Sequence, residues 1–359
     1  MCGCYCRDTS RRVRKKYNIV AGQPALNDIV MERLRIVYLG TPDFAVEPLR
    51  RLLENQQACP DCGYEIVGVV TMPDKMINKR GNQLLMSPVK QYAVAAGLPI
   101  LQPESLKDET FQEALRAWRA DLQIVVAFRM LPESVWNMPR LGTFNLHASL
   151  LPQYRGAAPI NRAIINGDKE TGVTTFFLKH EIDTGDVIYR DVVAIDEKDN
   201  AGTLHDKLML QGGDTVMRTV GAIVNGTATA VAQGTMYATE QELRPAPKIF
   251  RDTCRISWDK SVEGVYDFVR GMSPYPAAWL ELLDADGKAI AVKVYEVAKE
   301  LCNHNYEAGT LLTDGKTYAK VAVNDGYVSL LDVQLAGKKR MPIGDLLRGF
   351  NIAGMKINK

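Results

Sequence analysis

Residues 34–72, LRIVYLGTPDFAVEPLRRLLENQQACPDCGYEIVGVVTM, decide the fold class of this chain. Residues 34–40 and 64–72 are short, nearly continuous apolar runs, which are typical of strands buried on both faces of a sheet. Between them, residues 45–55 carry apolar side chains at helical spacing. A strand, a helix and a second strand in this order predict the start of a parallel sheet.

The same alternation continues along the chain. It predicts helices at 87–97, 108–120 and 203–226, and strands at 98–103, 121–128 and 142–149. We therefore expect an α/β domain over residues 31–225 with a doubly wound, mostly parallel sheet, which would bind ligands beyond the carboxyl ends of its strands. Residues 40–44, GTPDF, stand where a dinucleotide fold carries G-x-G-x-x-G, and the second and third glycines are absent, which argues against a dehydrogenase.

The pattern changes after residue 226. Residues 226–250 contain prolines and no clear periodicity, which is typical of a linker. Residues 251–359 alternate short apolar runs with Asp-Gly turns at 286–287, 314–315 and 325–326, which predicts a small antiparallel β-barrel of OB-like type. By fold-level analogy alone, such a barrel binds oligonucleotides.

Composition sets further bounds. The chain has 359 residues, 46% hydrophobic and 24% charged, and its length favours two domains. Six of the 44 Lys and Arg, but only two of the 42 Asp and Glu, fall within residues 1–30. The rest of the chain therefore has a net charge of −2. Any nucleic acid must then bind to local basic patches. No apolar run has the roughly 18–20 residues of a membrane span, and we expect no membrane association.

Residues 1–30 differ in composition from the rest of the chain. They combine three cysteines, a basic run and no apolar periodicity, and Met31 follows them directly, shortly before the first strand. We expect this extension to be disordered or to lie upstream of the true start. Cys59 and Cys62 form a single CPDC, which favours a turn over a zinc or redox site, and we expect a cytoplasmic protein with no metal.

Polar side chains of catalytic type gather at two places. Asn145 and His147 lie two residues apart on a predicted strand and so project from one face near its end. Asp183 lies in the polar turn HEIDTGD, for which a plain hairpin turn is the alternative. Together the three suit acyl transfer: His147 takes a proton from an attacking amine, Asp183 holds the imidazole, and Asn145 donates to the developing oxyanion. Ser149 lacks the G-x-S-x-G context of a serine hydrolase nucleophile.

Several stretches resemble the methionyl-tRNA formyltransferases. They are GTPDFAVEPLRRLL, SPVKQYAVAAGLPILQPESL, the long segment from MPRLGTFNLHASLLPQYRGAAPIN to HEIDTGDVIYR, and FVRGMSPYPAAWLEL. The resemblance runs from about Arg33 to the C-terminus. It implies transfer of a formyl group from 10-formyltetrahydrofolate to the amino group of methionine on initiator tRNA, and it matches Asn145, His147 and Asp183 to the family's catalytic residues.

The resemblance also implies binding residues. For the folate it implies two loops. One is AFRMLP, residues 127–132, which is one residue shorter than usual and has Arg129 where a glycine is common. The other is the signature loop after His147, residues 149–156. The residues concerned are Phe128, Arg129, Met130, Leu131, Ser149, Leu150, Leu151, Pro152 and Asp186. Arg155 of the same signature loop suits either a phosphate contact or a salt bridge that packs the loop.

Basic residues are the candidates for tRNA contact, because phosphates require only flexible cations. Arg80 matches the family's basic loop, with Lys75 and Lys79 in support. In the C-terminal domain the candidates are Lys248, Arg251, Arg270, Lys338, Lys339 and Arg340, for which a solvated surface is the alternative.

Other functions remain open on the sequence alone. A folate-dependent formyltransferase acting on a sugar-nucleotide amine or on glycinamide ribonucleotide would share Asn145, His147 and Asp183, but the purine enzyme lacks a C-terminal barrel and a bifunctional sugar enzyme carries a dehydrogenase domain. A non-catalytic RNA-binding protein is the alternative from a different class. We expect a monomer.

Overall fold

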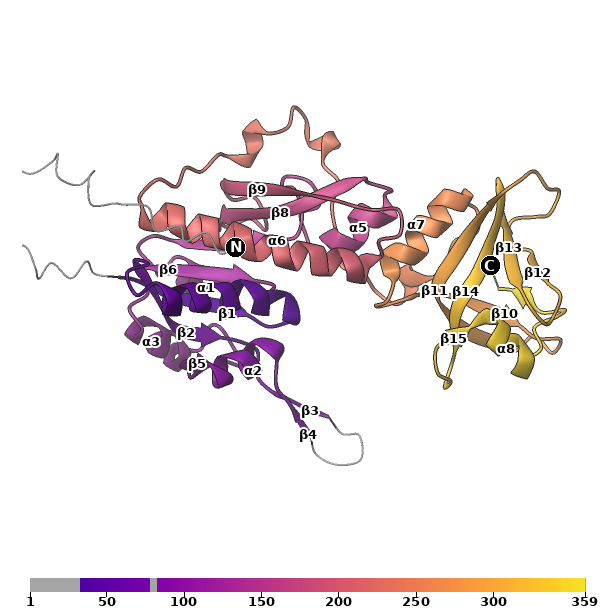
Figure 1. Cartoon of the computed structure of the whole chain (residues 1–359), viewed down its shortest axis with the longest axis horizontal. Helices are drawn as coiled ribbons and strands as arrows, with labels where there is room; N and C mark the ends of the chain where they lie inside the picture. The colour runs from indigo at the N-terminus through magenta and orange to yellow at the C-terminus, as the bar shows by residue number, and fades with distance from the viewer. Residues whose placement is uncertain (1–32, 78–82, 359) are drawn as a thin grey trace, which may run out of the picture. The chain divides into compact units, whose positions relative to one another are not determined.

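Seven strands form the sheet of the N-terminal domain. The computed structural model describes residues 33–77 and 83–358 (Figure 1), so the predicted extension at 1–30 lies outside the described residues. The strand order is β5-β2-β1-β6-β7-β8-β9, in which β1 pairs in parallel with β2 and β6, and β6 pairs in parallel with β7. Their bounds are β1 (Leu34–Gly40), β2 (Tyr64–Val70), β5 (Ile100–Leu101), β6 (Leu122–Val126), β7 (Thr143–His147), β8 (Glu170–Phe177) and β9 (Val187–Ala194).

Both faces of this sheet are buried, as the apolar runs predicted. Ile36 and Tyr38 of β1 pack with α1 (Val46–Ala58) and α6 (Ala201–Val224), whereas Val37 and Leu39 pack with α3 (Glu109–Ala117) and α4 (Glu133–Trp136) on the other side. The expected doubly wound sheet is confirmed. It is mostly parallel, because β8 and β9 add an antiparallel edge beside β7.

Local signals explain where the helices begin. Ser87 caps α2 (Pro88–Ala95) by accepting the N–H of Lys90, and Asp108 caps α3 by accepting the N–H of Phe111. Asn200 caps the 24-residue helix α6 in a capping box with Thr203.

Two further elements complete the N-terminal domain. A short hairpin, β3 (Lys75–Ile77) and β4 (Gln83–Leu85), projects between β2 and α2. Helix α5 (Pro159–Ile165) comes after the signature loop.

The expected antiparallel barrel of the C-terminal domain is confirmed, and the structure adds a helix, α7, ahead of its strands. Its sheet runs β12-β13-β14-β11-β10-β16, with β15 paired to β14. Apolar side chains of α7 and of alternate strand positions fill a core of their own. The bounds are α7 (Val262–Met272), β10 (Ala278–Leu283), β11 (Ala289–Leu301), β12 (Leu311–Thr313), β13 (Ala319–Val323), β14 (Gly326–Leu335), β15 (Met341–Pro342), α8 (Ile343–Gly349) and β16 (Lys356–Ile357).

The segment predicted as a linker packs on the N-terminal domain. Val231 pairs with Val187 at the start of β9, and Ala246 pairs with Gly156 of the signature loop. Residues 226–250 contain two single-turn helices, Gln233–Thr235 and Glu240–Glu242, and no longer element. This segment therefore covers the loop after His147 before the chain enters the barrel.

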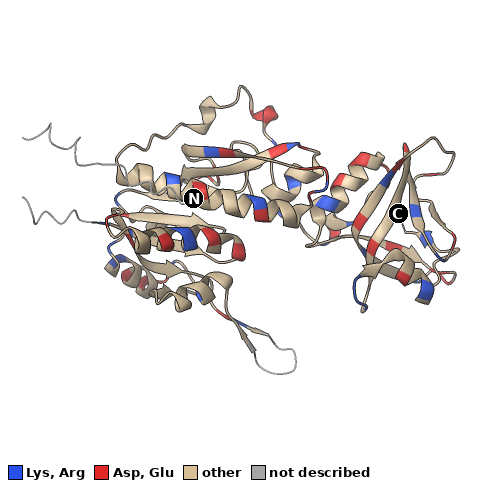
Figure 2. Ribbon diagram, viewed as in Figure 1, with Lys and Arg blue, Asp and Glu red and all other residues tan. Residues whose placement is uncertain are grey.

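The structure also shows how the charges are distributed, the turn at CPDC and the apolarity of the helices. Figure 2 shows acidic and basic residues interspersed over both domains. Cys59 and Cys62 form a turn closed by the Cys62 N–H and the Cys59 carbonyl, 3.0 Å apart, as predicted for CPDC. Within the described ranges, none of the helices has the length and apolarity required to span a bilayer.

Candidate active site

His147 ends β7 at the carboxyl edge of the sheet, where the fold predicts ligands to bind. Its Nε2 lies 2.9 Å from the backbone carbonyl oxygen of Tyr154 in the signature loop. A carbonyl oxygen accepts hydrogen bonds and cannot donate them, so Nε2 carries the ring proton when the imidazole is neutral. The other ring nitrogen, Nδ1, is then the one with a free lone pair.

Nδ1 of His147 faces Asp183. The distance from Nδ1 to Oδ2 of Asp183 is 3.8 Å, and the two side chains are only 8% and 14% exposed. The same carboxylate oxygen accepts the backbone N–H of Gly156 at 2.9 Å. This separation is that of an ion pair, so the carboxylate is placed to stabilise a proton that arrives on Nδ1. The ring itself is held by the Tyr154 carbonyl.

The turn that carries Asp183 is held in an unusual backbone conformation. Asp183 has a φ of +55°, which costs a non-glycine residue conformational energy. Two residues later, position 185 requires glycine, because a Cβ there would collide with the carbonyl oxygen of Phe177. Nε2 of Gln233 donates to the carbonyls of Asp183 and Gly185, both at 2.8 Å, and Gln233 is buried. Gln233 therefore fixes the turn from outside it.

Asn145 lies on the same face of β7 as His147, as the strand spacing predicted. Its side chain is partly exposed. Within residues 33–77 and 83–358, no side chain or backbone group forms a hydrogen bond with the side-chain amide of Asn145. A partly exposed amide beside the imidazole thus keeps both its N–H donors for a ligand.

The signature loop after His147 is stabilised by internal hydrogen bonds. The hydroxyl of Ser149 donates to the carbonyl of Gln153 at 2.6 Å, and Thr174 of β8 bonds the Ser149 carbonyl and the Leu151 N–H. Ser149, Leu151 and Pro152 are buried, and Leu150 is partly buried beside Gly172. These side chains pack the loop, and their predicted contact with folate stays a prediction.

The AFRMLP loop comes after β6, next to β7. Arg129 donates to the carbonyls of Glu104, at 2.8 Å, and Pro103, so its guanidinium binds the loop after β5. Leu131 belongs to the core, whereas Phe128 is partly exposed and Met130 is 72% exposed. The departure at Arg129 therefore ties two loops together. The role of all four residues toward folate stays a prediction.

Two further candidates on the sheet edge have protein partners. Asp186 accepts a hydrogen bond from Lys179 at 2.6 Å and is about one-third exposed. Arg155 donates to Oε1 of Gln233 at 2.7 and 3.0 Å, which packs the loop without the acidic partner expected for a salt bridge.

The basic candidates for tRNA contact fall into three groups. Lys75 is exposed on β3, while Lys79 and Arg80 lie outside the described residues. Lys248 lies over the exposed ring of Phe250, and Lys338 and Lys339 are exposed in the turn between β14 and β15. The others are less available: Arg251 and the ring of Trp279 are in contact, Arg340 pairs with Asp332 at 2.8 Å, and Arg270 is buried.

Arg270 corrects one sequence-based expectation. Its Nε donates to Asp267 at 2.7 Å, and its Nη1 donates to the Asp199 carbonyl at 2.9 Å. Because this guanidinium is buried between α7 and the loop before α6, it joins those elements and is not a surface phosphate contact. Helical spacing alone did not reveal that the residue faces another domain.

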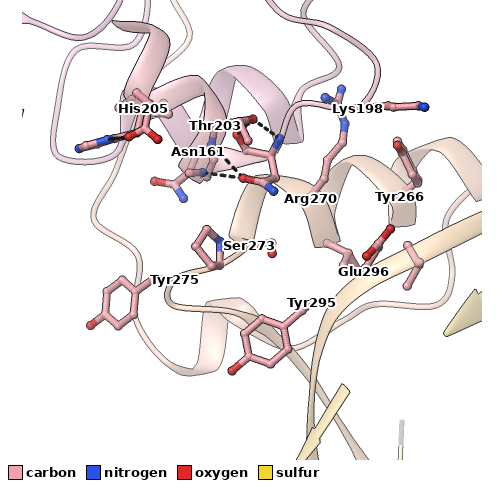
Figure 3. A pocket seen from close by; sticks show the side chains of 18 of the residues that line it. Asn161, Lys198, Thr203, His205, Tyr266, Arg270, Ser273, Tyr275, Tyr295 and Glu296 are labelled. Carbon is pink, nitrogen blue, oxygen red and sulfur yellow. Dashed lines mark hydrogen bonds and ion pairs between the residues drawn. The ribbon is translucent and has the colours of Figure 1, made fainter. Parts of the chain in front are cut away.

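A hollow of about 1120 Å³ lies where α6 begins and α7 ends (Figure 3). His147 and Asp183 do not line it, so it is separate from the catalytic candidates. The rings of Tyr275 and Tyr295 lie along one side of it, and Tyr275 is 83% exposed.

Three residues at the site escaped the sequence analysis: Tyr154, Gln233 and Arg244. Tyr154 acts through its backbone carbonyl, which no residue type signals. Gln233 lies 78 residues from Arg155 along the chain. Arg244, whose Nη1 donates to the Tyr154 hydroxyl at 3.1 Å, lies 90 residues from Tyr154. In the sequence, the only indication was that the segment predicted as a linker contains a glutamine and an arginine, Gln233 and Arg244.

Comparisons with known proteins identify the family of the chain. Residues 34–220 match the family model "Formyl transferase", and residues 248–351 match "Formyl transferase, C-terminal domain". The methionyl-tRNA formyltransferase of Bacteroides thetaiotaomicron is 62% identical over 328 residues, covering 91% of this chain and 99% of that protein. That of Parabacteroides distasonis is 61% identical over 319 residues, covering 89% and 96%.

Solved structures show the same fold at lower identity. The crystal structure of WlaRD, a sugar 3N-formyl transferase in the presence of dTDP and 5-N-formyl-THF, superposes with a TM-score of 0.58 at 17% identity and covers 85% of this chain and 99% of that one. The expected resemblance is thus confirmed by sequence over most of the chain and by fold. The chain belongs to the formyl transferase family and, within it, to the methionyl-tRNA formyltransferases.

Proposed function

We propose that this chain transfers the formyl group of 10-formyltetrahydrofolate to the methionine amino group of initiator methionyl-tRNA, for the initiation of translation. Relatives at 60–62% identity are named for the methionyl-tRNA reaction, which supports the acceptor. The donor is supported by the distant structural relative that was crystallised with a formylated tetrahydrofolate. The enzyme would act as a monomer in the cytoplasm.

The observation that carries the proposal is the geometry at His147. Its Nε2 is bonded to the Tyr154 carbonyl, and its Nδ1 faces the buried Asp183 carboxylate. A neutral imidazole in this tautomer offers Nδ1 as a base, and the carboxylate stabilises the imidazolium that results. A site with these properties suits removal of a proton from an attacking amine.

The bond changes in the reaction balance around these residues. The methionine nitrogen forms a bond to the formyl carbon, the bond from that carbon to N10 of the donor breaks, and one proton passes from the amine to N10. His147 accepts the amine proton and returns it to N10. The unpartnered N–H groups of Asn145 donate to the formyl oxygen as negative charge develops there.

The residues fit a folate in two respects. The loops after β6 and β7 follow two paired strands at the carboxyl edge, and there Phe128, which is partly exposed, and Met130, which is exposed, offer apolar side chains. We propose that the loop at Phe128, Arg129, Met130 and Leu131 holds the pterin partly through its backbone. Ser149, Leu150, Leu151, Pro152 and Asp186 would shape the opposite wall.

The tRNA would contact separate cationic points. Lys75, Lys248, Lys338 and Lys339 are proposed for phosphate contacts, as are Lys79 and Arg80. The exposed ring of Tyr275 in the hollow of Figure 3 suits stacking on a base.

The test is direct. Purified protein is incubated with 10-formyltetrahydrofolate and methionyl-tRNA, and N-formylmethionine is detected by mass spectrometry after release of the amino acid. We expect product with initiator tRNA from the wild type and none above background from His147→Ala. A formylated sugar nucleotide in place of formylmethionine would contradict the proposed acceptor, and RNA binding without any formyl transfer would contradict the enzyme.

A further inference from the structure

The interdomain segment contacts the catalytic residues through a few side chains and carbonyls. Residues 231–246, here termed the strap, come after α6 in the chain. The strap pairs with the start of β9 at Val231 and with the signature loop at Ala246. Gln233 of the strap bonds both the Asp183 turn and Arg155. The carbonyl of Ala246 accepts the N–H groups of Ala157 and Ala158 at 2.8 and 3.2 Å.

The contact nearest to His147 is at Tyr154. The N–H of Tyr154 donates to the Arg244 carbonyl at 2.7 Å. The Tyr154 hydroxyl donates to Oδ2 of Asp168 at 2.6 Å, and Nη1 of Arg244 donates to that hydroxyl at 3.1 Å and to Oδ1 of Asp168 at 2.5 Å. Asn166 donates to the same hydroxyl at 3.1 Å. Tyr154 is thus held at its N–H and at its hydroxyl.

This anchoring constrains a backbone that would otherwise relax. Tyr154 has a φ of +60°, a conformation that non-glycine residues adopt only where their surroundings impose it. The carbonyl that accepts Nε2 of His147 belongs to this same residue. Relaxation of φ at Tyr154 would rotate that carbonyl away from the imidazole. Burial raises the pKa of the Tyr154 hydroxyl, which therefore remains a donor to Asp168 at neutral pH.

We propose that Arg244 is a positioning residue: with Asp168 it holds Tyr154, and the Tyr154 carbonyl then keeps the His147 imidazole in the Nε2–H tautomer, with Nδ1 as the base toward Asp183. This inference rests on the proposed function of His147. The strap then has a role in catalysis, because a residue of the segment that leads into the C-terminal barrel positions the carbonyl that holds His147.

The effect on activity is expected to exceed any effect on folding. The Arg244 side chain is 54% exposed, and exposed ion pairs contribute little to stability because water screens them. Small displacements of catalytic groups, in contrast, reduce turnover by about 10- to 100-fold. A variant that lowers kcat and leaves unfolding unchanged separates positioning from stability.

Arg218 provides a matched control. It forms an ion pair of similar exposure with Asp191, 2.9 Å apart, and its guanidinium lies 4.2 Å from the ring centroid of Tyr189. Arg244 likewise pairs with an aspartate beside a tyrosine. No hydrogen bond of Arg218 reaches the signature loop or the strap among the described residues, so Arg218→Gln repeats the chemical change without touching Tyr154.

The first measurement is nitrogen NMR of protein labelled with 15N-histidine, and it does not depend on turnover. The chain has four histidines, and His147→Gln identifies the His147 signals. We expect His147 of the wild type and of Arg218→Gln to show a protonated Nε2 and an unprotonated Nδ1. Arg244→Gln is expected to show a mixture of the two tautomers, and Arg244→Lys to restore part of the wild-type signal.

Turnover is the second measurement. Arg244→Gln and Tyr154→Phe should each lower kcat about 10- to 100-fold with little change in KM for tRNA. For Arg244→Gln the midpoint of thermal unfolding should stay close to that of Arg218→Gln, because both side chains are exposed. Identical His147 spectra and identical kcat in Arg244→Gln and the wild type would overturn the proposal. Absence of formyl transfer in the wild type, with the tautomer shift present in Arg244→Gln, would instead overturn the proposed function and leave the positioning role.

Discussion

The backbone carbonyl oxygen of Tyr154 lies 2.9 Å from Nε2 of His147. Because that oxygen can only accept, it determines which imidazole nitrogen carries the proton and which one is free to take another. Asp183 then faces the free nitrogen at 3.8 Å. The proposed catalytic arrangement thus depends on a main-chain atom, seven residues after the histidine, as well as on the three side chains that the sequence predicts.

Replacing His147 should remove most of the activity. His147→Ala is expected to lower kcat by about 10²- to 10⁴-fold, because the amine must then lose its proton without a positioned base. The measurement is the rate of N-formylmethionine formation at saturating donor and tRNA. Binding of the folate, followed by fluorescence or calorimetry, should persist in the variant; a variant with near wild-type kcat would refute the assigned role.

Asp183→Asn should impair the chemistry and preserve the fold. The new amide oxygen can still accept the Gly156 N–H, which the carboxylate accepts at 2.9 Å. The negative charge that stabilises the imidazolium is lost, because a neutral amide oxygen then faces Nδ1 of His147. We expect kcat to fall about 100-fold or more with an unchanged unfolding midpoint, measured side by side. A loss of stability equal to that of a core variant would indicate a structural role instead.

Gly156→Ala should destabilise the protein and disturb the site together. Gly156 has a φ of +123°, and a Cβ there would lie 2.5 Å from the carbonyl oxygen of Ala246. Strain and the forced displacement of the strap should cost about 1–3 kcal/mol in the free energy of unfolding. Gly221→Ala in α6 is the control, because a Cβ there meets nothing within 4 Å and should add about 0.5–1 kcal/mol. Denaturant titration of both variants measures whether each substitution lowers or raises the free energy of unfolding.

Acid should weaken the attachment of the loop before α6 to the first turns of that helix, because the Asp199 carboxylate bonds the Asp196 N–H, Thr203 and Lys207. Burial would raise the pKa of this carboxyl, but Lys207, the Asp196 N–H and Thr203 bond it, and the net effect lowers the pKa. A carboxylate with a lowered folded-state pKa stabilises the protein above its unfolded pKa, near 3.9, and loses that contribution as the pH falls through the folded value.

The test of this acid dependence is the free energy of unfolding at pH 6 and pH 3. Asp199→Asn should be less stable than the wild type at pH 6, and the difference between the two should shrink at pH 3. Asp286→Asn, in an exposed turn, serves as the control and should track the wild type at both values. A constant difference between Asp199→Asn and the wild type would contradict this account.

The lysines of the β14–β15 turn should affect tRNA binding and spare the chemistry. Lys338 and Lys339 are exposed, and neither forms an ion pair within the described part of the chain. The double variant Lys338→Ala/Lys339→Ala should raise KM for tRNA at constant kcat. It should also make the salt dependence of binding shallower, by about one unit of log–log slope for each phosphate that the variant no longer neutralises. Lys288→Ala, in the exposed turn before β11, is the control; equal slopes in all three proteins would exclude a role of the two lysines in tRNA binding.

Much of the fold was predictable because its signals are local. Continuous apolar runs such as residues 34–40 indicate strands covered on both faces, and α1 and α3 do cover β1 from its two sides. The face shared by Asn145 and His147 follows from the two-residue period of a strand. The buried position of Arg270 was not predictable, because its helical spacing is the same whether the helix faces water or another domain.

The sequence by itself determined the fold class, the family and the residue types that suit formyl transfer, because periodicity and motif spacing are properties of neighbouring residues. Only the tertiary structure decided how these residues meet. The contacts of Gln233 and Arg244 with the site join positions 48 to 90 residues apart, and one essential acceptor is a backbone carbonyl that every residue possesses. Hydrogen-bond direction, burial and backbone conformation at Tyr154 depend on the folded chain as a whole, and they select the nitrogen of His147 that can act as a base.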